Sequence, residues 1–132
     1  AQLIRVLAAA TRAGAPVAIS SAVPLPAGLI ALFGQEFSPA TVRSVVVESD
    51  VRWNARALQG ELGADRIRLI GSAAARHALA TALEPYPEVA IYAGPVTTSG
   101  RLELLPFLRE QLISITAHRY GNPDSQIASI EF

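Results

Sequence analysis

Helical and extended patterns of apolar residues alternate at the start of the chain. Residues spaced as on one face of a helix are Leu3, Ile4, Val6, Leu7 and Ala10. This spacing predicts an amphipathic helix over about residues 2–13, ended by Gly14 and Pro16. The apolar run at 16–20 then predicts a short buried strand.

Residues 21–41 show no sustained period. Prolines and glycines interrupt them at Pro24, Pro26, Gly28, Gly34 and Pro39. We therefore expect a packed loop, with at most one helical turn from Leu29 to Phe33.

Strands and helices alternate again from residue 42 to about residue 110. The predicted strands are 42–47, 67–70 and 89–92, and the predicted helices are 51–62, 72–83 and 102–110. Ser49 or Asp50 can cap the first of these helices, and Gly63 can close it. Its expected buried residues are Trp53, Ala57, Leu58 and Leu62. The second helix, which starts at Gly71-Ser72, is expected to bury Leu79, Ala82 and Leu83.

The end of the chain has a different pattern. Residues 113–118 alternate apolar and polar side chains, as a half-exposed strand does. Residues 121–124 are a strong turn signal, and residues 127–132 are prone to extended structure. Both a terminal hairpin and a strand followed by a tail are compatible with this pattern.

This order of elements predicts an α/β fold. Short buried strands that alternate with helices favour a Rossmann-like, doubly wound and mostly parallel sheet. We expect this domain to span residues 1–112, with a C-terminal strand or hairpin extension over residues 113–132.

Composition narrows the possible functions. The 132 residues carry no net charge, and all eleven basic residues are Arg. Without Lys there is no Schiff-base chemistry and no phosphate-binding P-loop lysine, and without Cys there is no thiolate nucleophile or thiolate metal ligand. A neutral chain with no basic cluster argues against nucleic-acid binding, and no apolar run is long enough for a membrane span. We expect a cytoplasmic protein and, because the chain begins at Ala1 rather than Met, a part of a longer one.

Ligands of doubly wound sheets bind at the carboxyl ends of the strands. The candidate segments there are 20–21, 48–50, 71–72 and 92–95. Glu48 could hold a ribose, but the Gly-rich turn of a dinucleotide site is missing after the first strand. We favour Glu48 and Asp50 as helix-start residues and Ser72 as a helix cap over nucleotide or anion binding.

Other catalytic arrangements find little support. His77 and His118 have no neighbouring metal ligands in the sequence, and no Gly-x-Ser-x-Gly motif occurs. Glu103 and Glu110 lie two helical turns apart and could form a carboxylate pair, but a solvated helix face is the favoured interpretation. We assign no catalytic, cofactor-binding or metal-ligating residue.

Three blocks of sequence resemble a known family. They are VAIYAGPVTTSGR from Val89, LELLPFLREQ from Leu102 and SITAHRYGNP from Ser114. Together they resemble the C-terminal region of proline utilization A, a bacterial-type fusion of proline dehydrogenase and glutamate-semialdehyde dehydrogenase. Residues 100–115 are also similar to the end of aldehyde dehydrogenases in general.

This resemblance implies a role without chemistry. Longer members of the family append a domain related to the aldehyde dehydrogenase superfamily, which is catalytically inactive, covers the channel for the intermediate and supports assembly. FAD and NAD are implied for the parent protein and none for this chain, which lacks the family's cysteine nucleophile and NAD-binding lysine. The implied partners are the dehydrogenase domains of the parent chain, with a second subunit as a further candidate. The alternative is an enzyme domain that binds a small molecule or nucleotide in the crevice at the strand ends.

The C-terminal extension is our candidate interface. An unpaired strand edge offers backbone N–H and C=O groups to a partner, and apolar side chains gain little at an unpartnered chain end. The alternative is an edge hairpin within the chain. The candidate interface residues are Ile113, Ile115, His118, Tyr120, Ile127, Ile130 and Phe132.

Overall fold

The computed structural model describes residues 1–35, 37, 41–109, 118–119 and 122–123. Its first half contains helix α1 (Gln2–Arg12), strand β1 (Val17–Ser21), helix α2 (Ala27–Gln35) and strand β2 (Val42–Val47). Its second half contains α3 (Asp50–Leu58), β3 (Arg66–Arg68), α4 (Ala73–Ala82) and β4 (Ala90–Tyr92). Helix α5 (Gly100–Leu104) and a 3-10 turn (Leu105–Phe107) follow. The predicted alternation of helices and strands is therefore present.

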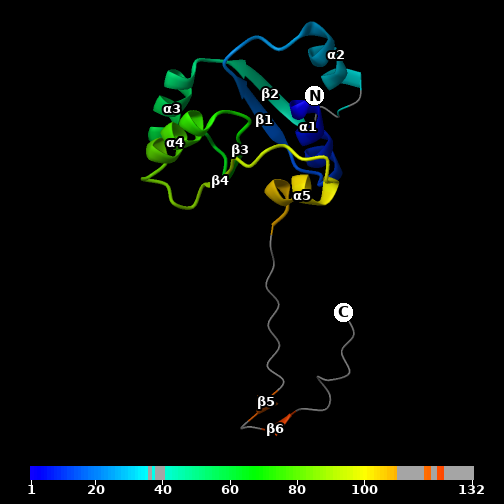
Figure 1. Cartoon of the computed structure of the whole chain (residues 1–132), viewed down its shortest axis with the longest axis vertical. Helices are drawn as coiled ribbons and strands as arrows, with labels where there is room; N and C mark the ends of the chain where they lie inside the picture. Colours follow the sequence, from blue (N-terminus) through cyan, green and yellow to red (C-terminus); the bar gives the residue numbers. More distant parts are fainter. Residues whose placement is uncertain (36, 38–40, 110–117, 120–121, 124–132) are drawn as a thin grey trace.

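The strands of the two halves form parallel pairs. Strand β1 pairs with β2 from Val17 opposite Val42 to Ser21 opposite Val47, with an irregularity after the first pair. Strand β3 pairs with β4 over three residues of each strand. Helices α3 and α4 lie on one side of these strands, and α1 and α5 lie on the other (Figure 1). The fold is mixed α/β with helices on both sides, but its described strands are grouped in separate two-stranded sheets.

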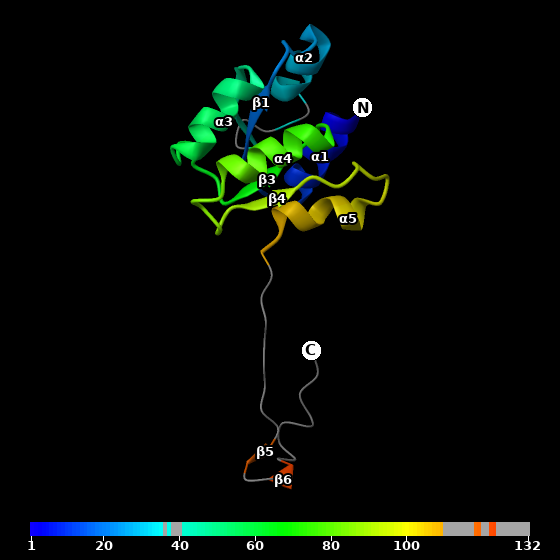
Figure 2. The same cartoon turned by 60° about the vertical axis from the view of Figure 1, so that its left-hand side comes forward.

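Each half has its own apolar core. In the first half, Leu7 of α1 packs against Ile19 of β1 and against Phe37. In the second half, Ala57 of α3, Ile67 of β3 and Leu79 of α4 form the centre of a cluster that Ala82 and Leu83 complete. Figure 2 shows α3 and α4 beside β3 and β4, the arrangement that this cluster requires. Burial of Leu79, Ala82 and Leu83 confirms the predicted inward face of α4, and burial of Ala57 confirms one position of the predicted inward face of α3.

Helix α2 corrects the prediction of a packed loop. The segment from Ala27 to Gln35 is helical, and the N–H groups of Leu29 and Ile30 donate to the Pro26 carbonyl at its start. Half-buried Leu32 and Phe33 pack against the core of the first half. Proline before the first turn is compatible with a helix start because it removes an N–H that needs no partner there. Pro24 and Pro26, which indicated a loop, therefore precede the helix, and Pro39 follows it in the sequence.

Helix α3 ends earlier than predicted. Its last helical residue is Leu58, and Gly60 then adopts a φ of +72°. This left-handed conformation turns the chain before Leu62 can continue the helix. Leu58, predicted to be buried, is 55% exposed, and Trp53 is half-buried against the core rather than enclosed by it. The expected inward face of α3 is thus correct at Ala57 and wrong at Leu58.

At the C-terminal end, the structure describes two short strands. Strand β5 (His118–Arg119) pairs antiparallel with β6 (Asn122–Pro123). Asn122 and Pro123 therefore belong to a strand and not to the centre of the predicted turn. Most of the predicted extension lies outside the described residues. No helix in the described part of the chain has the length and hydrophobicity that crossing a membrane requires.

Candidate functional site

The carboxyl ends of β1 and β2 carry a buried carboxylate whose Oε1 is bound by two side chains. Glu48 follows β2, and its side chain is 3% exposed. Its Oε1 accepts a hydrogen bond from Ser20 Oγ at 3.1 Å and lies 2.7 Å from a guanidinium nitrogen of Arg56 on α3. The Glu48 N–H donates to the Ser21 carbonyl at 3.0 Å, which extends the strand pairing. Glu48 therefore joins β1, β2 and α3.

This geometry concerns the two roles considered for Glu48, the start of a helix and the binding of a ribose. Glu48 is not a helix-start residue, because Ser49 caps α3 by accepting the Arg52 N–H, and Asp50 is the first helical residue. The Glu48 oxygen that could have held a ribose hydroxyl is bound by Ser20 and Arg56 instead.

A second buried ion pair lies beyond the ends of β3 and β4. Arg68 of β3 and Glu103 of α5 have side chains 8% and 6% exposed. The guanidinium approaches both carboxylate oxygens, with nitrogen–oxygen distances of 3.0 to 3.3 Å. Such two-pronged contacts are the stronger form of the arginine–carboxylate bond.

Backbone groups complete the second pair. The other terminal nitrogen of Arg68 donates to three carbonyls, of Leu69, Tyr92 and Gly94, at 3.2, 3.1 and 2.8 Å. The Thr97 N–H donates to Glu103 Oε1 at 2.7 Å. The backbone from Tyr92, the last residue of β4, to Thr97 is therefore held by hydrogen bonds to the ion pair.

The surroundings of Glu103 change its titration. Burial alone would raise the pKa of the carboxyl group. Hydrogen bonds from Arg68 and Thr97 outweigh burial, and the charges of Arg68 and Arg5 act in the same direction. The pKa of Glu103 is consequently lowered from its ordinary value of 4.5.

Glu103 also corrects the expectation of a solvated helix face. It is buried and bound to arginine, whereas Glu110, its proposed companion in a carboxylate pair, lies outside the described residues. The sequence contained no signal for the Arg68–Glu103 pair, because the two residues are 35 positions apart.

Ser72 and His77 are the remaining candidates among the described residues. Ser72 Oγ accepts the Ala75 N–H at 3.1 Å, which confirms it as the N-cap of α4. His77 is exposed on α4. Within the described ranges, no group of three or more metal-ligating side chains converges.

Six of the seven candidate interface residues are not among the described residues. Ile113, Ile115, Tyr120, Ile127, Ile130 and Phe132 lie outside the described residues. His118 lies in β5, opposite Pro123 of β6. The interface therefore stays a prediction.

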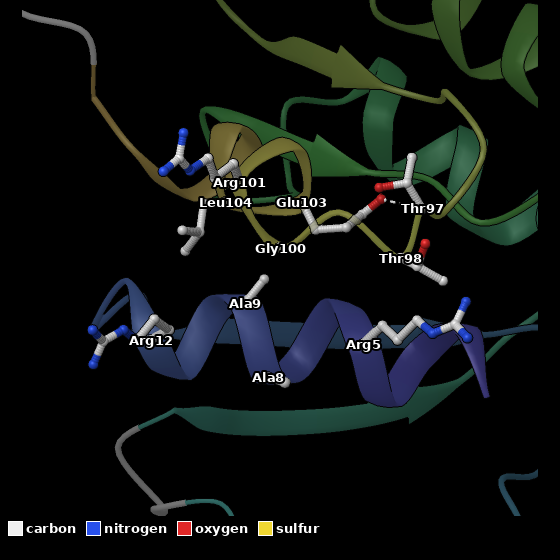
Figure 3. A pocket seen from close by; sticks show the side chains of 10 residues that line it. All are labelled: Arg5, Ala8, Ala9, Arg12, Thr97, Thr98, Gly100, Arg101, Glu103 and Leu104. Carbon is white, nitrogen blue, oxygen red and sulfur yellow. Dashed lines mark hydrogen bonds between the residues drawn. The ribbon is translucent and has the colours of Figure 1, made fainter.

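The structure also contains a groove that the sequence patterns did not indicate. It lies between α1 and α5, has a volume of about 610 Å³, and is lined by Arg5, Arg12 and Arg101 (Figure 3). A smaller cavity of about 150 Å³ lies beside Gly60 and Tyr86. Neither of these two cavities is lined by Ser20, Glu48 or Tyr92.

Comparison of the chain with protein-family models, with curated proteins and with solved structures found no match. The functional argument consequently rests on the residues and contacts described above.

Proposed function

We propose that this chain is a non-catalytic domain of a bifunctional enzyme that converts proline to glutamate, and that it covers the channel of the intermediate and supports assembly. The observation that carries the proposal is the engagement of two buried carboxylates near the strand ends by arginines, at Glu48–Arg56 and Glu103–Arg68. Groups that would bind or activate a substrate in this kind of fold are used here to join secondary-structure elements. The blocks that resemble proline utilization A, together with the lack of Cys and Lys, support the same conclusion.

Strand β2 supports a role in assembly. Val45, Val46 and Val47 are 38%, 42% and 53% exposed. Successive side chains of a strand point to opposite faces, so apolar side chains are exposed on both faces of β2. Neighbouring β-branched residues that remain in water are typical of a strand that packs against a partner. We infer that the dehydrogenase domains of the parent chain, or a second subunit, cover this strand.

The finer description of the fold belongs to the same proposal. Two parallel strand pairs with helices on both sides are the parts from which a Rossmann-like, doubly wound sheet is built. We infer that the domain is a reduced member of that class and that it acts in the cytoplasm, which the absence of cysteine favours.

The test uses the full-length protein. We expect the double variant Val46→Glu/Val47→Glu to keep its circular dichroism spectrum, because both side chains are exposed, but to lower the mass in solution and the efficiency of intermediate transfer. Burial of two carboxylates in an apolar interface should weaken association at least about tenfold. The matched control is Val23→Glu, at a 65% exposed position outside the strands, which should change neither quantity.

Deletion of residues 121–132 tests the predicted C-terminal interface in the same assays. If both variants are folded and neither changes mass or transfer, the domain has no assembly role and the proposal is wrong.

A further inference from the structure

The groove between α1 and α5 collects cationic side chains from two elements. Arg5 and Arg12 come from α1, and Arg101 comes from α5. All three are exposed, and none takes part in an ion pair with another described side chain. Figure 3 shows Arg12 and Arg101 toward one end of the groove, on its opposite walls, and Arg5 toward the other end, near Thr98.

The carboxylate of the groove does not neutralise these arginines. Glu103 contributes to the lining, but Arg68 already binds both of its oxygens and the Thr97 N–H binds one of them. Arg68 forms the ion pair with Glu103, and Arg5 adds a coulombic interaction without an ion pair, so the positive charges at the groove still outnumber the single carboxylate. Such a potential attracts anions.

The middle of the groove is lined by apolar side chains. Between the two arginines of α1, the helix contributes the small apolar side chains of Ala8 and Ala9, and Leu104 contributes from α5. Arg5 and Arg12 are seven residues apart, which corresponds to a rise of about 10 Å along the helix. The groove thus has a cationic group or pair at each end and an apolar stretch between them.

We propose that this groove binds an elongated organic anion that carries an acidic group at each end of an apolar chain. One acidic group binds Arg12 at the end of the groove where Arg101 adds positive charge, and the other contacts Arg5, with the Thr98 hydroxyl as a further hydrogen-bond donor. The groove volume lies within the range of small-molecule sites, roughly 300–1,000 Å³. Guanidinium groups can bind the oxygens of carboxylates and of phosphates in the same two-pronged geometry. The proposed class of ligand therefore includes both dicarboxylates and bisphosphates. The proposal is independent of the proposed assembly role.

Isothermal titration calorimetry with suberate, an eight-carbon dicarboxylate, tests this inference. At low ionic strength, where screening is weak, we expect saturable binding with a Kd below about 1 mM. Hexanoate, with one acidic group, and succinate, with a shorter chain, should each bind at least tenfold more weakly because neither reaches both ends. Hexane-1,6-bisphosphate distinguishes the acidic groups: tighter binding than suberate assigns phosphate, and weaker binding assigns carboxylate.

Variants locate the binding. The double variant Arg12→Gln/Arg101→Gln and the single variant Arg5→Gln should each weaken suberate at least tenfold, while Arg76→Gln, an exposed position on α4 that does not line the groove, should leave Kd unchanged. All replaced side chains are exposed, so the variants are expected to fold. The proposal is overturned if suberate gives no saturable heat, if the groove variants bind like the original chain, or if succinate and suberate bind equally well.

Discussion

Arg68 and Glu103 illustrate how single residues determine the character of the strand ends. Both side chains are almost fully buried, and their contacts join β3, the segment after β4, and α5. Taking a carboxylate out of water is costly unless arginine and backbone donors replace the lost water, as they do here. The pair therefore has a structural role, and its removal should lower the stability of the second half of the chain.

The first prediction concerns Glu103→Gln. Gln keeps the size of the side chain but removes its charge, which leaves the Arg68 guanidinium buried without a counter-ion. We expect the free energy of unfolding to fall by about 3 kcal/mol, measured by urea denaturation at pH 7. Asp65→Asn is the control, because the Asp65–Arg109 pair is exposed and should contribute less than about 1 kcal/mol. Equal effects of the two substitutions would contradict the structural role of the buried pair.

The second prediction is the pH dependence of this contribution. The pKa of Glu103 is lower in the folded state than in the unfolded chain, so its ionised form stabilises the fold. This contribution is complete above the ordinary pKa of 4.5 and is lost as the pH falls through the lowered folded-state pKa. The stability difference between the original chain and Glu103→Gln, measured in urea from pH 7 to about pH 3, should therefore shrink with acidification. A difference that stays constant over this range would show that the Glu103 charge does not stabilise the fold.

At this scale the sequence allowed little prediction. The Ser72 cap could be inferred because its partner is three residues away, and capping follows a local pattern. The Glu103–Arg68 and Glu48–Ser20 contacts join residues 35 and 28 positions apart. Their formation depends on how the strands and helices pack, which no local pattern records. The grouping of the three arginines at the groove could not be predicted from the sequence either, because it depends on the packing of α1 beside α5.

Among the secondary-structure elements, strands and amphipathic helices were the most predictable. The periodic apolar positions of α1 and α4 correspond to observed helices, because local propensity and burial agree there. At β2 the β-branched run forms a strand although its valines are exposed, because local propensity favours extended structure. Helix α2 was missed because its flanking prolines suggested a loop, although the contacts of Leu32 and Phe33 with the first core stabilise a helix. The end of α3 differs from the predicted end because Gly60, three residues before Gly63, already turns the chain.

The third prediction follows from that helix end. A Cβ at Gly60 would lie 2.8 Å from the Tyr86 Oη, which donates to the Leu58 carbonyl at the end of α3. Since the φ of +72° also disfavours any L side chain, Gly60→Ala should lower the free energy of unfolding by about 1–2 kcal/mol or more. Gly28→Ala is the control, because Gly28 is helical and nothing lies within 4 Å of its would-be Cβ, so stability should rise by about 0.5–1 kcal/mol. Thermal denaturation distinguishes the two, and a neutral Gly60→Ala would contradict this account of the turn.

For the molecule as a whole, the two cores have different surroundings. The second core is covered by α3 and α4, while β2 at the edge of the first half exposes its valines. Neutral composition and a low charged fraction agree with a domain that meets another protein surface. The predicted α/β class is confirmed, whereas the predicted doubly wound sheet is not, because the described strands form separate two-stranded sheets. Short strands specify local pairing and not how the pairs join.

The central claim is that the polar groups near the strand ends stabilise the fold and do not bind a nucleotide. Isothermal titration calorimetry of the chain with millimolar NAD tests it most directly, with Arg5→Gln titrated in parallel to separate the α1–α5 groove from the strand ends. We expect that Arg5→Gln shows no saturable heat of NAD binding. The reason is that Glu48 and Glu103 are already bound by arginines and that no Gly-rich turn follows β1. A Kd below about 100 μM that is equal in both proteins would contradict the claim, since it would mean that a site at the strand ends accepts the cofactor.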